Sequence, residues 1–322
     1  MRTPRVILRA VLIVGVALLA GGQLARLVLI AQSSPTGTLV DIGGRRLNVV
    51  CQGDGRSTVW LEAGLNDFSV QWDAVQRGLA ATTRVCAYDR AGLGWSDPPD
   101  GVPDLEAAAS DLARLVRDHR PGRPVVLVGH SYGALIVRVA AERLGSLVSG
   151  VVLVDPAHED QLDELPALRG ALGSAASVFR ALDLASRAGA LAALQPWIPA
   201  RGLTGRAKEA YASALATRPY FRWAAAETEA LAESAELLQR RRVPFGSVPL
   251  VVISRGRAEP LPGADPHRVA DDEARWQRLQ RRTVALSLQG SQRIAGGSGH
   301  AVPQERPDIV IEAVREMVVR SR

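Results

Sequence analysis

The stretch from Val125 to Gly133 constrains the fold of this 322-residue chain more than any other. It reads Val-Val-Leu-Val-Gly-His-Ser-Tyr-Gly, so an apolar run typical of a buried parallel strand leads directly into the pattern Gly-x-Ser-x-Gly. Apolar residues at helical spacing follow from Ala134 to Leu144. A turn this tight strains its middle residue and leaves no room for flanking side chains, which accounts for Gly129 and Gly133. We therefore expect Ser131 to be held out of the sheet with an accessible hydroxyl.

Further apolar runs alternate with helical patterns along the rest of the chain. Besides the strand before Ser131, seven strands are expected, at residues 38–42, 45–51, 58–62, 84–88, 150–154, 249–253 and 293–295. Helices outside the region 157–247 are expected at residues 69–80, 103–119 and 304–319. Strands that alternate with helices imply a mostly parallel sheet covered on both faces.

The segment around Ser131 resembles the nucleophile elbow of the α/β-hydrolase family. Residues 89–97, Asp-Arg-Ala-Gly-Leu-Gly-Trp-Ser-Asp, resemble a second segment of that family, which we interpret as a structural turn. The resemblance covers about residues 38–320 and implies an α/β-hydrolase fold, with an eight-stranded, mostly parallel sheet flanked by helices.

A long helical insertion interrupts the alternation of strands and helices. Residues 157–247 are rich in Ala, Leu and Arg and show no convincing strand. They resemble the cap that many α/β hydrolases carry between the sixth and seventh strands. An independent helical domain is the alternative. The expected division is therefore a hydrolase core at 38–156 and 248–322 and a helical cap at 157–247.

The family's chain order of nucleophile, acid and histidine can be followed downstream of Ser131. His300 stands in Gly-Gly-Ser-Gly-His, after the last expected strand and before the terminal helix, where the family places its histidine base. We expect His300 to accept the proton of Ser131. The remaining four histidines are expected to be structural or solvated: His119, His130, His158 and His267.

Three carboxylates compete for the role of the acid. Asp155 ends the sixth expected strand, a position that one branch of the family uses. Glu259 follows the seventh strand and matches the commonest family placement, with Glu in place of Asp; Asp265 lies on the same loop. We favour Asp155 because it is shorter and sits directly on a strand end.

The oxyanion formed during acyl transfer requires two aimed N–H donors. The backbone of Tyr132, at the start of a helix, is expected to supply one, and that of Leu65 the other. The loop before Leu65 reads Glu62-Ala63-Gly64 where the family usually has His-Gly, so the second donor is less well supported. Asn66 is interpreted as a turn residue, with a side chain assisting the oxyanion as the alternative.

The two cysteines lie in strands that are neighbours in the fold that this chain resembles. Cys51 ends the second expected strand and Cys86 lies in the fourth. A disulfide and a pair of buried free thiols both stay open, because the sequence does not fix the strand register. The cysteines and five scattered histidines lack metal-ligand spacing, so no metal or organic cofactor is expected.

Residues 1–31 are mostly apolar, with three arginines among the first nine positions. The run, interrupted by Arg26, is long enough to cross a bilayer, and its basic flank predicts a cytoplasmic N-terminus and an extracytoplasmic catalytic domain. A signal peptide cleaved near Ala20 and Gly22, giving a secreted protein, is the alternative; a buried soluble helix is a third interpretation. Residues 32–37 form a polar linker.

The predicted function is hydrolysis of a carboxylic ester by a serine hydrolase, carboxylesterase-like or lipase-like, through an acyl-enzyme. The expected partners are a small-molecule ester or acyl substrate and a membrane. The net charge of +6 also permits attraction to nucleic acid, but no stretch alternates basic and aromatic residues, so no nucleic-acid partner is expected. Acyltransferase, thioesterase or amidase chemistry on the same triad, and a non-catalytic binding protein, remain alternatives.

Overall fold

The computed structural model describes residues 4–119, 123–199, 202–260 and 265–320. Within these residues eight strands form one sheet in the order β1-β2-β4-β3-β5-β6-β7-β8, in which β1, β2 and β4 pair antiparallel and β4 to β8 pair parallel. The expected fold is thereby confirmed. The strands are β1 (Thr38–Asp41), β2 (Arg46–Gln52), β3 (Thr58–Glu62), β4 (Arg84–Tyr88), β5 (Val125–His130), β6 (Val148–Val154), β7 (Leu250–Arg255) and β8 (Gly290–Ala295).

Helices cover both faces of the sheet, which is why its central strands are apolar along their whole length. Successive residues of a strand point to opposite faces, so Leu61 packs with α2 (Asp73–Leu79) and α12 (Pro307–Arg320). Its neighbour Trp60 packs with α3 (Leu105–His119) and α4 (Gly133–Leu144) on the other face. The carboxyl ends of the parallel strands meet at one edge of the sheet, where Ser131 and Asp155 follow β5 and β6.

Three helical predictions need correction. The helix expected at 304–319 is divided into α11 (Val302–Glu305) and α12, because Pro307 lacks the N–H that would continue the first helix. The helix expected at 69–80 begins as the 3₁₀ turn η1 (Ser69–Trp72). Between β7 and β8 the chain forms α10 (Val269–Val284), which the sequence interpretation did not include.

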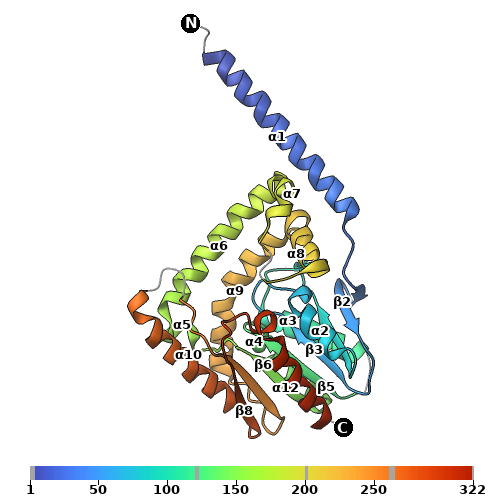
Figure 1. Cartoon of the computed structure of the whole chain (residues 1–322), viewed down its shortest axis with the longest axis vertical. Coiled ribbons are helices and arrows are strands. Elements are labelled where there is room, and N and C mark those ends of the chain that lie inside the picture. Colours follow the sequence, from blue (N-terminus) through green and yellow to red (C-terminus); the bar gives the residue numbers. More distant parts are fainter. Residues whose placement is uncertain (1–3, 120–122, 200–201, 261–264, 321–322) are drawn as a thin grey trace.

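The described residues between β6 and β7 form helices and no strand. The helices are α5 (Gln161–Glu164), α6 (Pro166–Arg187), α7 (Ala190–Ala193), the 3₁₀ turn η3 (Gln195–Trp197), α8 (Gly205–Thr217) and α9 (Tyr220–Arg241). The two long helices α6 and α9 pack against each other, and α6 leads to an apex at α7 (Figure 1). This interval is the place where the sequence predicted a helical cap.

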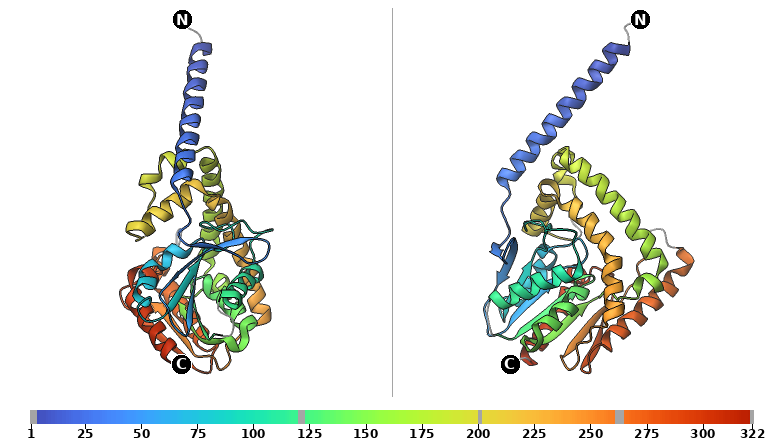
Figure 2. Two further views of the ribbon diagram at one scale, coloured as in Figure 1. Left: turned by 90° about the vertical axis from the view of Figure 1, so that its right-hand side faces the viewer. Right: turned by 180° about the vertical axis from the view of Figure 1, so that it is seen from behind.

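Helix α1 (Pro4–Gln32) extends away from the rest of the molecule and touches it at the apex (Figures 1 and 2). Its segment Leu12–Gln32 is long and apolar enough to cross a membrane. Only 6% of its apolar stretch is buried, which distinguishes α1 from the core helix of a soluble protein.

Cys51 and Cys86 form a disulfide. They face each other on the antiparallel strands β2 and β4, with Cα atoms 4.1 Å apart, as the close pairs of an antiparallel ladder require. The interpretation as free thiols is therefore wrong.

Candidate active site

Ser131 lies between β5 and α4 with a backbone φ of +50°, a conformation that non-glycine residues rarely adopt. A Cβ atom on Gly129 would come within 2.7 Å of the carbonyl oxygen of Gly133, and one on Gly133 within 2.5 Å of the Ala63 oxygen. These neighbours are backbone atoms that cannot move aside, so both positions require glycine. The turn holds Ser131 above the sheet, as the motif predicted.

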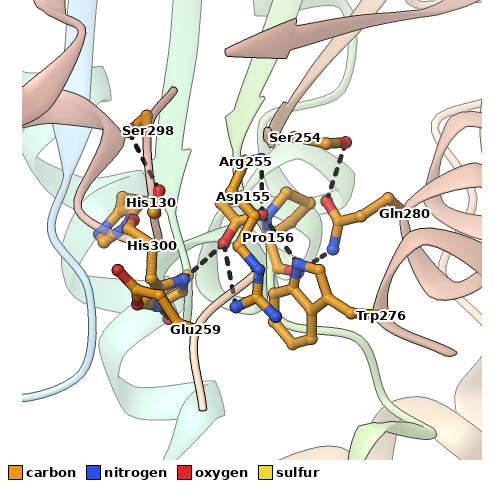
Figure 3. Close-up of polar contacts among 12 residues, drawn as sticks. His130, Asp155, Pro156, Ser254, Arg255, Glu259, Trp276, Gln280, Ser298 and His300 are labelled. Carbon is orange, nitrogen blue, oxygen red and sulfur yellow. Dashed lines mark hydrogen bonds and ion pairs between the residues drawn. The ribbon is translucent and has the colours of Figure 1, made fainter. Parts of the chain in front are cut away.

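The Ser131 hydroxyl lies 2.9 Å from Nε2 of His300, and Nδ1 of the same ring lies 2.6 Å from Oδ2 of Asp155 (Figure 3 shows the second contact). We assign the proton to Nδ1, because the carboxylate accepts it there and leaves Nε2 to accept from the hydroxyl. The structure thus brings together three residues from the ends of β5 and β6 and from the loop after β8.

Asp155 is fully buried and also has a positive φ, of 37°. Its Oδ1 accepts hydrogen bonds from the backbone N–H of Arg255 at 3.0 Å and from the indole N–H of Trp276 at 2.9 Å (Figure 3). Burial by itself would raise the pKa of Asp155, but the hydrogen bond and charge of His300, with the Arg255 charge, outweigh it and hold the pKa below its usual value. The carboxylate is therefore ionised at neutral pH.

The other two candidate acids interact with residues other than His300. Glu259 lines the same cavity as His300, but its charge partner is Arg257 at 3.7 Å, and no hydrogen bond joins it to His300 in the described chain (Figure 3). Asp265 accepts the N–H of His267 and begins a short 3₁₀ turn. Of the three carboxylates, Asp155 is the one that contacts the imidazole.

Leu65 and Tyr132 line the same cavity as Ser131, and the backbone N–H of neither residue donates a hydrogen bond within the described residues. Both are thus available to an oxygen of a bound ligand. Asn66 has a φ of +61°, and its side-chain amide donates to Thr228 of α9 at 2.9 Å. Its interpretation as a turn residue fits this position better than a role in binding the oxyanion.

A buried arginine holds the loop that leads to Leu65. Arg90 forms ion pairs with Glu62, at 2.7 Å, and with Glu227 of α9, at 2.6 Å. It also donates to the carbonyl oxygens of Ala63, at 2.8 Å, and Gly64, at 2.7 Å. The residues that replace the family's His-Gly are therefore fixed by a guanidinium group, and the orientation of the next peptide follows from them.

This charge cluster was only partly visible in the sequence. Arg90 belongs to the segment interpreted as a structural turn, and the Glu62 carboxylate marks a departure from the family pattern, but nothing distinguished Glu227 from other helix glutamates. Burial raises the pKa of Glu62 to about 7, against the opposing effect of Arg90. Glu227 also accepts the backbone N–H of Asn66 at 2.6 Å, so α9 binds the loop directly as well as through Arg90.

His130 connects the loops around the site. The Gly64 N–H donates to the side-chain oxygen of Gln71 at 3.0 Å, and the Gln71 amide donates to Nδ1 of His130. The other ring nitrogen of His130 donates to the carbonyl oxygen of His300 at 2.9 Å. Burial, with the nearby charge of His300, lowers the pKa of His130 to about 3, so the ring is neutral. The expectation of a structural role fits this neutral, buried link.

The cavity at the site has a volume of about 360 Å³. Leucines from α6, α9 and the α5–α6 turn form its apolar wall: Leu165, Leu168, Leu172 and Leu231. Four carboxylates also line it: Asp67, Glu259, Asp272 and Glu273. The lining arginine, Arg255, is already paired with Glu273 at 2.7 Å. Acidic groups thus outnumber cationic groups around the apolar wall.

The sheet order, the elbow after β5 and the histidine loop after β8 define an α/β hydrolase. The chain belongs to the alpha/beta hydrolase family, whose model matches residues 49–313. A curated relative, the 2-(acetamidomethylene)succinate hydrolase of Mesorhizobium japonicum, is 28% identical over 282 residues, covering 87% of this chain and 94% of the relative.

Solved structures share the fold. An esterase from Thermogutta terrifontis aligns with a TM-score of 0.60 at 21% identity, over 88% of this chain and 97% of the esterase. The epoxide hydrolase CorEH aligns with a TM-score of 0.63 at 20% identity, over 89% of this chain and 99% of that protein. At this identity the likeness concerns the fold, and the chemistry has to be argued from the site.

Proposed function

We propose that this hydrolase cleaves carboxylic esters through an acyl-enzyme on Ser131. The observation that carries the proposal is the hydrogen-bonded series Ser131–His300–Asp155 beside the free N–H groups of Leu65 and Tyr132. The Ser131 oxygen attacks the carbonyl carbon while His300 accepts its proton, and Asp155 stabilises the imidazolium. The two N–H groups stabilise the oxyanion.

His300 then acts as an acid to complete acylation. His300 returns the proton to the departing alkoxide as the tetrahedral intermediate collapses, which leaves the acyl group on Ser131. Water then attacks the acyl-enzyme with His300 as base, and His300 returns the proton to the Ser131 oxygen as the second tetrahedral intermediate collapses and releases the acid. An epoxide hydrolase that works through a carboxylate nucleophile would need Asp at position 131, so serine at this position favours ester hydrolysis.

The cavity supports a preference for neutral, apolar acyl groups. A carboxylate in the substrate would meet three acidic side chains, those of Asp67, Glu259 and Asp272, beside the Arg255–Glu273 ion pair. The Mesorhizobium relative is named for a substituted succinate, which is a dicarboxylate. We propose that this chain differs from it in disfavouring such substrates.

We also propose that α1 anchors the enzyme in a membrane, with the catalytic domain outside the cytoplasm, as the basic N-terminal flank predicts. Retention of the helix is supported by its contacts: the side chain of Gln23 donates to the Arg187 carbonyl, and that of Arg26 donates to the Thr217 carbonyl at 3.3 Å. A cleaved signal sequence would not need contacts with the folded domain. Residues 157–247 then act as a cap between the anchor and the core.

The test is hydrolysis of p-nitrophenyl esters by the full chain in detergent, with Ser131→Ala alongside. We expect turnover of short and medium neutral esters, slower turnover of a hemisuccinate ester, and loss of both turnover and fluorophosphonate labelling in Ser131→Ala. A folded wild type that neither hydrolyses esters nor takes the label would refute the proposal and favour a binding role. Product transfer to an added alcohol in preference to water would identify an acyltransferase.

A further inference from the structure

We propose that the apex of the helical interval rests on the surface of the bilayer that α1 crosses. The apex patch is defined by Leu184, Leu194 and Trp197, at the end of α6, after α7 and in η3. The inference rests on the anchoring proposed for α1 and is independent of the ester chemistry at Ser131.

Large apolar side chains are exposed at the apex. Leu184 is 69% exposed, Leu194 52% and Trp197 73%, although most of the other described tryptophans are buried in the core. Single exposed apolar residues are ordinary on protein surfaces, but these three share the end of the molecule where α1 departs (Figure 2). Tryptophan in particular is enriched at membrane–water interfaces, where its ring meets apolar chains and its N–H meets headgroups.

Close backbone packing fixes the apex beside α1. A Cβ atom on Gly189, which precedes α7, would come within 2.3 Å of the carbonyl carbon of Gly22 in α1. A Cβ atom on Gly22 would meet the Gly189 backbone at 3.1 Å. The two glycines therefore let α1 and the apex touch without an intervening side chain, and the Gln23 bond to the Arg187 carbonyl adds a polar link.

The length of α1 places this contact at the edge of the bilayer. The folded domain meets α1 at Gly22 and Gln23, so the part of α1 within the hydrocarbon has to precede Gly22 and is shifted towards the N-terminus relative to the segment Leu12–Gln32. From Pro4 to Gly21 the helix is about 27 Å long at ~1.5 Å per residue, close to the ~30 Å of a hydrocarbon core. Arg9 lies near the other end, where its long side chain can reach the opposite headgroups. Gly22 is thus where the span leaves the hydrocarbon, and the apex patch beside it lies at headgroup depth.

The basic residues around the apex are suited to contact with a membrane surface. Arg187 at the end of α6 is paired with Asp183, and Arg206 and Lys208 are exposed on α8, which contacts both α1 and α7. Glu209 is the exposed carboxylate on α8. The balance favours anionic headgroups, which attract basic residues close to a membrane.

The active-site cavity remains away from the bilayer in this arrangement. Its lining residue Leu172 precedes Arg187 on α6 by about 22 Å at ~1.5 Å per residue. Water-soluble esters therefore reach Ser131 from the aqueous side, and contact of the apex with lipid is separable from turnover.

The experiment uses tryptophan fluorescence of the full chain reconstituted in nanodiscs with lipids brominated near the glycerol backbone. Bromine quenches only indoles that it contacts, so we expect quenching in the wild type and its loss in Trp197→Phe. Trp223→Phe is the matched control, because the half-buried Trp223 packs against Gly92 of the hydrolase core, and it should keep the quenching. Gly22→Leu should weaken quenching by separating α1 from the apex.

Equal quenching in the wild type and Trp197→Phe would overturn the inference. A shift of Trp197 emission without dependence on brominated lipid would also overturn it and point to contact between two copies of the chain. Extraction of the chain from membranes by alkaline carbonate would refute the anchoring as well. Turnover of soluble esters should be the same in Trp197→Phe and the wild type, so failure of the hydrolase proposal, seen with Ser131→Ala, is distinguished from failure of this one.

Discussion

Arg90 and Glu227 form a bidentate ion pair that joins the turn after β4 to α9, with nitrogen–oxygen distances of 2.6 and 2.9 Å. Two parallel hydrogen bonds fix the plane of the guanidinium group. Its remaining donors bind Glu62 and the carbonyls of Ala63 and Gly64, and the Gly64 carbonyl belongs to the same peptide group as the Leu65 N–H. A glutamate of the helical interval therefore helps to set the direction of a proposed oxyanion donor in the core.

Glu227→Gln should lower kcat while leaving KM nearly unchanged. The neutral amide cannot hold Arg90 in the same plane, so the Leu65 N–H loses its alignment with an oxyanion that exists only in the transition state. Removal of a whole oxyanion donor costs about 10²- to 10³-fold in kcat, so partial misalignment should cost about 10- to 100-fold. Steady-state kinetics with a p-nitrophenyl ester measure both parameters.

The matched control is Glu159→Gln. It breaks a second buried pair, in which Arg138 of α4 donates to both oxygens of Glu159, and Glu159 does not line the cavity. Loss of one partner of a buried pair destabilises a protein by about 3–5 kcal/mol, so both variants should unfold at lower denaturant concentration. An equal fall of kcat in both would mean general loosening and would contradict the role of Arg90.

Asp155→Asn should reduce kcat by about 10⁴-fold, because the amide no longer stabilises the imidazolium or holds the required tautomer. Glu259→Gln should change kcat by less than about threefold, since no hydrogen bond joins Glu259 to His300 in the described chain. Both are measured with the same ester. The reverse ranking would assign the acid to Glu259.

His130→Gln should flatten the pH dependence of stability. The native pKa of His130, about 3, lies below its ordinary value of 6.5, so the unfolded chain binds more protons between these values. The stability that His130 contributes is complete above about pH 6.5 and is lost as the pH falls towards 3. A neutral glutamine removes this loss, which amounts to on the order of 2–3 kcal/mol by pH 4.

The measurement is denaturant unfolding of the full chain in detergent near pH 7 and near pH 4. Glu62 and His158 are unchanged in both proteins, so their own titration largely cancels in the comparison. Identical declines in the unfolding free energy for wild type and His130→Gln would show that His130 is not the group that titrates.

Removal of the disulfide should destabilise the fold without changing the site. Cys51 and Cys86 are 35 residues apart, and a cross-link over a loop of this length stabilises a protein by about 2–4 kcal/mol. The double variant Cys51→Ala/Cys86→Ala should unfold correspondingly earlier, keep its kcat, and be insensitive to dithiothreitol. Equal stability of the wild type with and without reductant would contradict the bond.

Local sequence patterns were sufficient to predict most of the fold. The eight strands were placed within a few residues, since apolar runs between glycine and polar breaks reflect burial on both faces of the sheet. The elbow around Ser131 was equally readable, because steric crowding imposes glycine at fixed positions. The helix α10 was not predicted. The role of Trp276 on this helix, whose indole N–H donates to Asp155, was therefore not predicted either.

The sequence by itself determined the strand order along the chain, the strained turn at Ser131 and the candidate acids, because these depend on periodicity and steric rules within a few residues. Three contacts became visible only in the folded chain: Asp155 and not Glu259 contacts His300, Cys51 faces Cys86, and Glu227 reaches Arg90. Those contacts join residues far apart in the chain, and their geometry is set by strand register and helix packing, which no local pattern encodes.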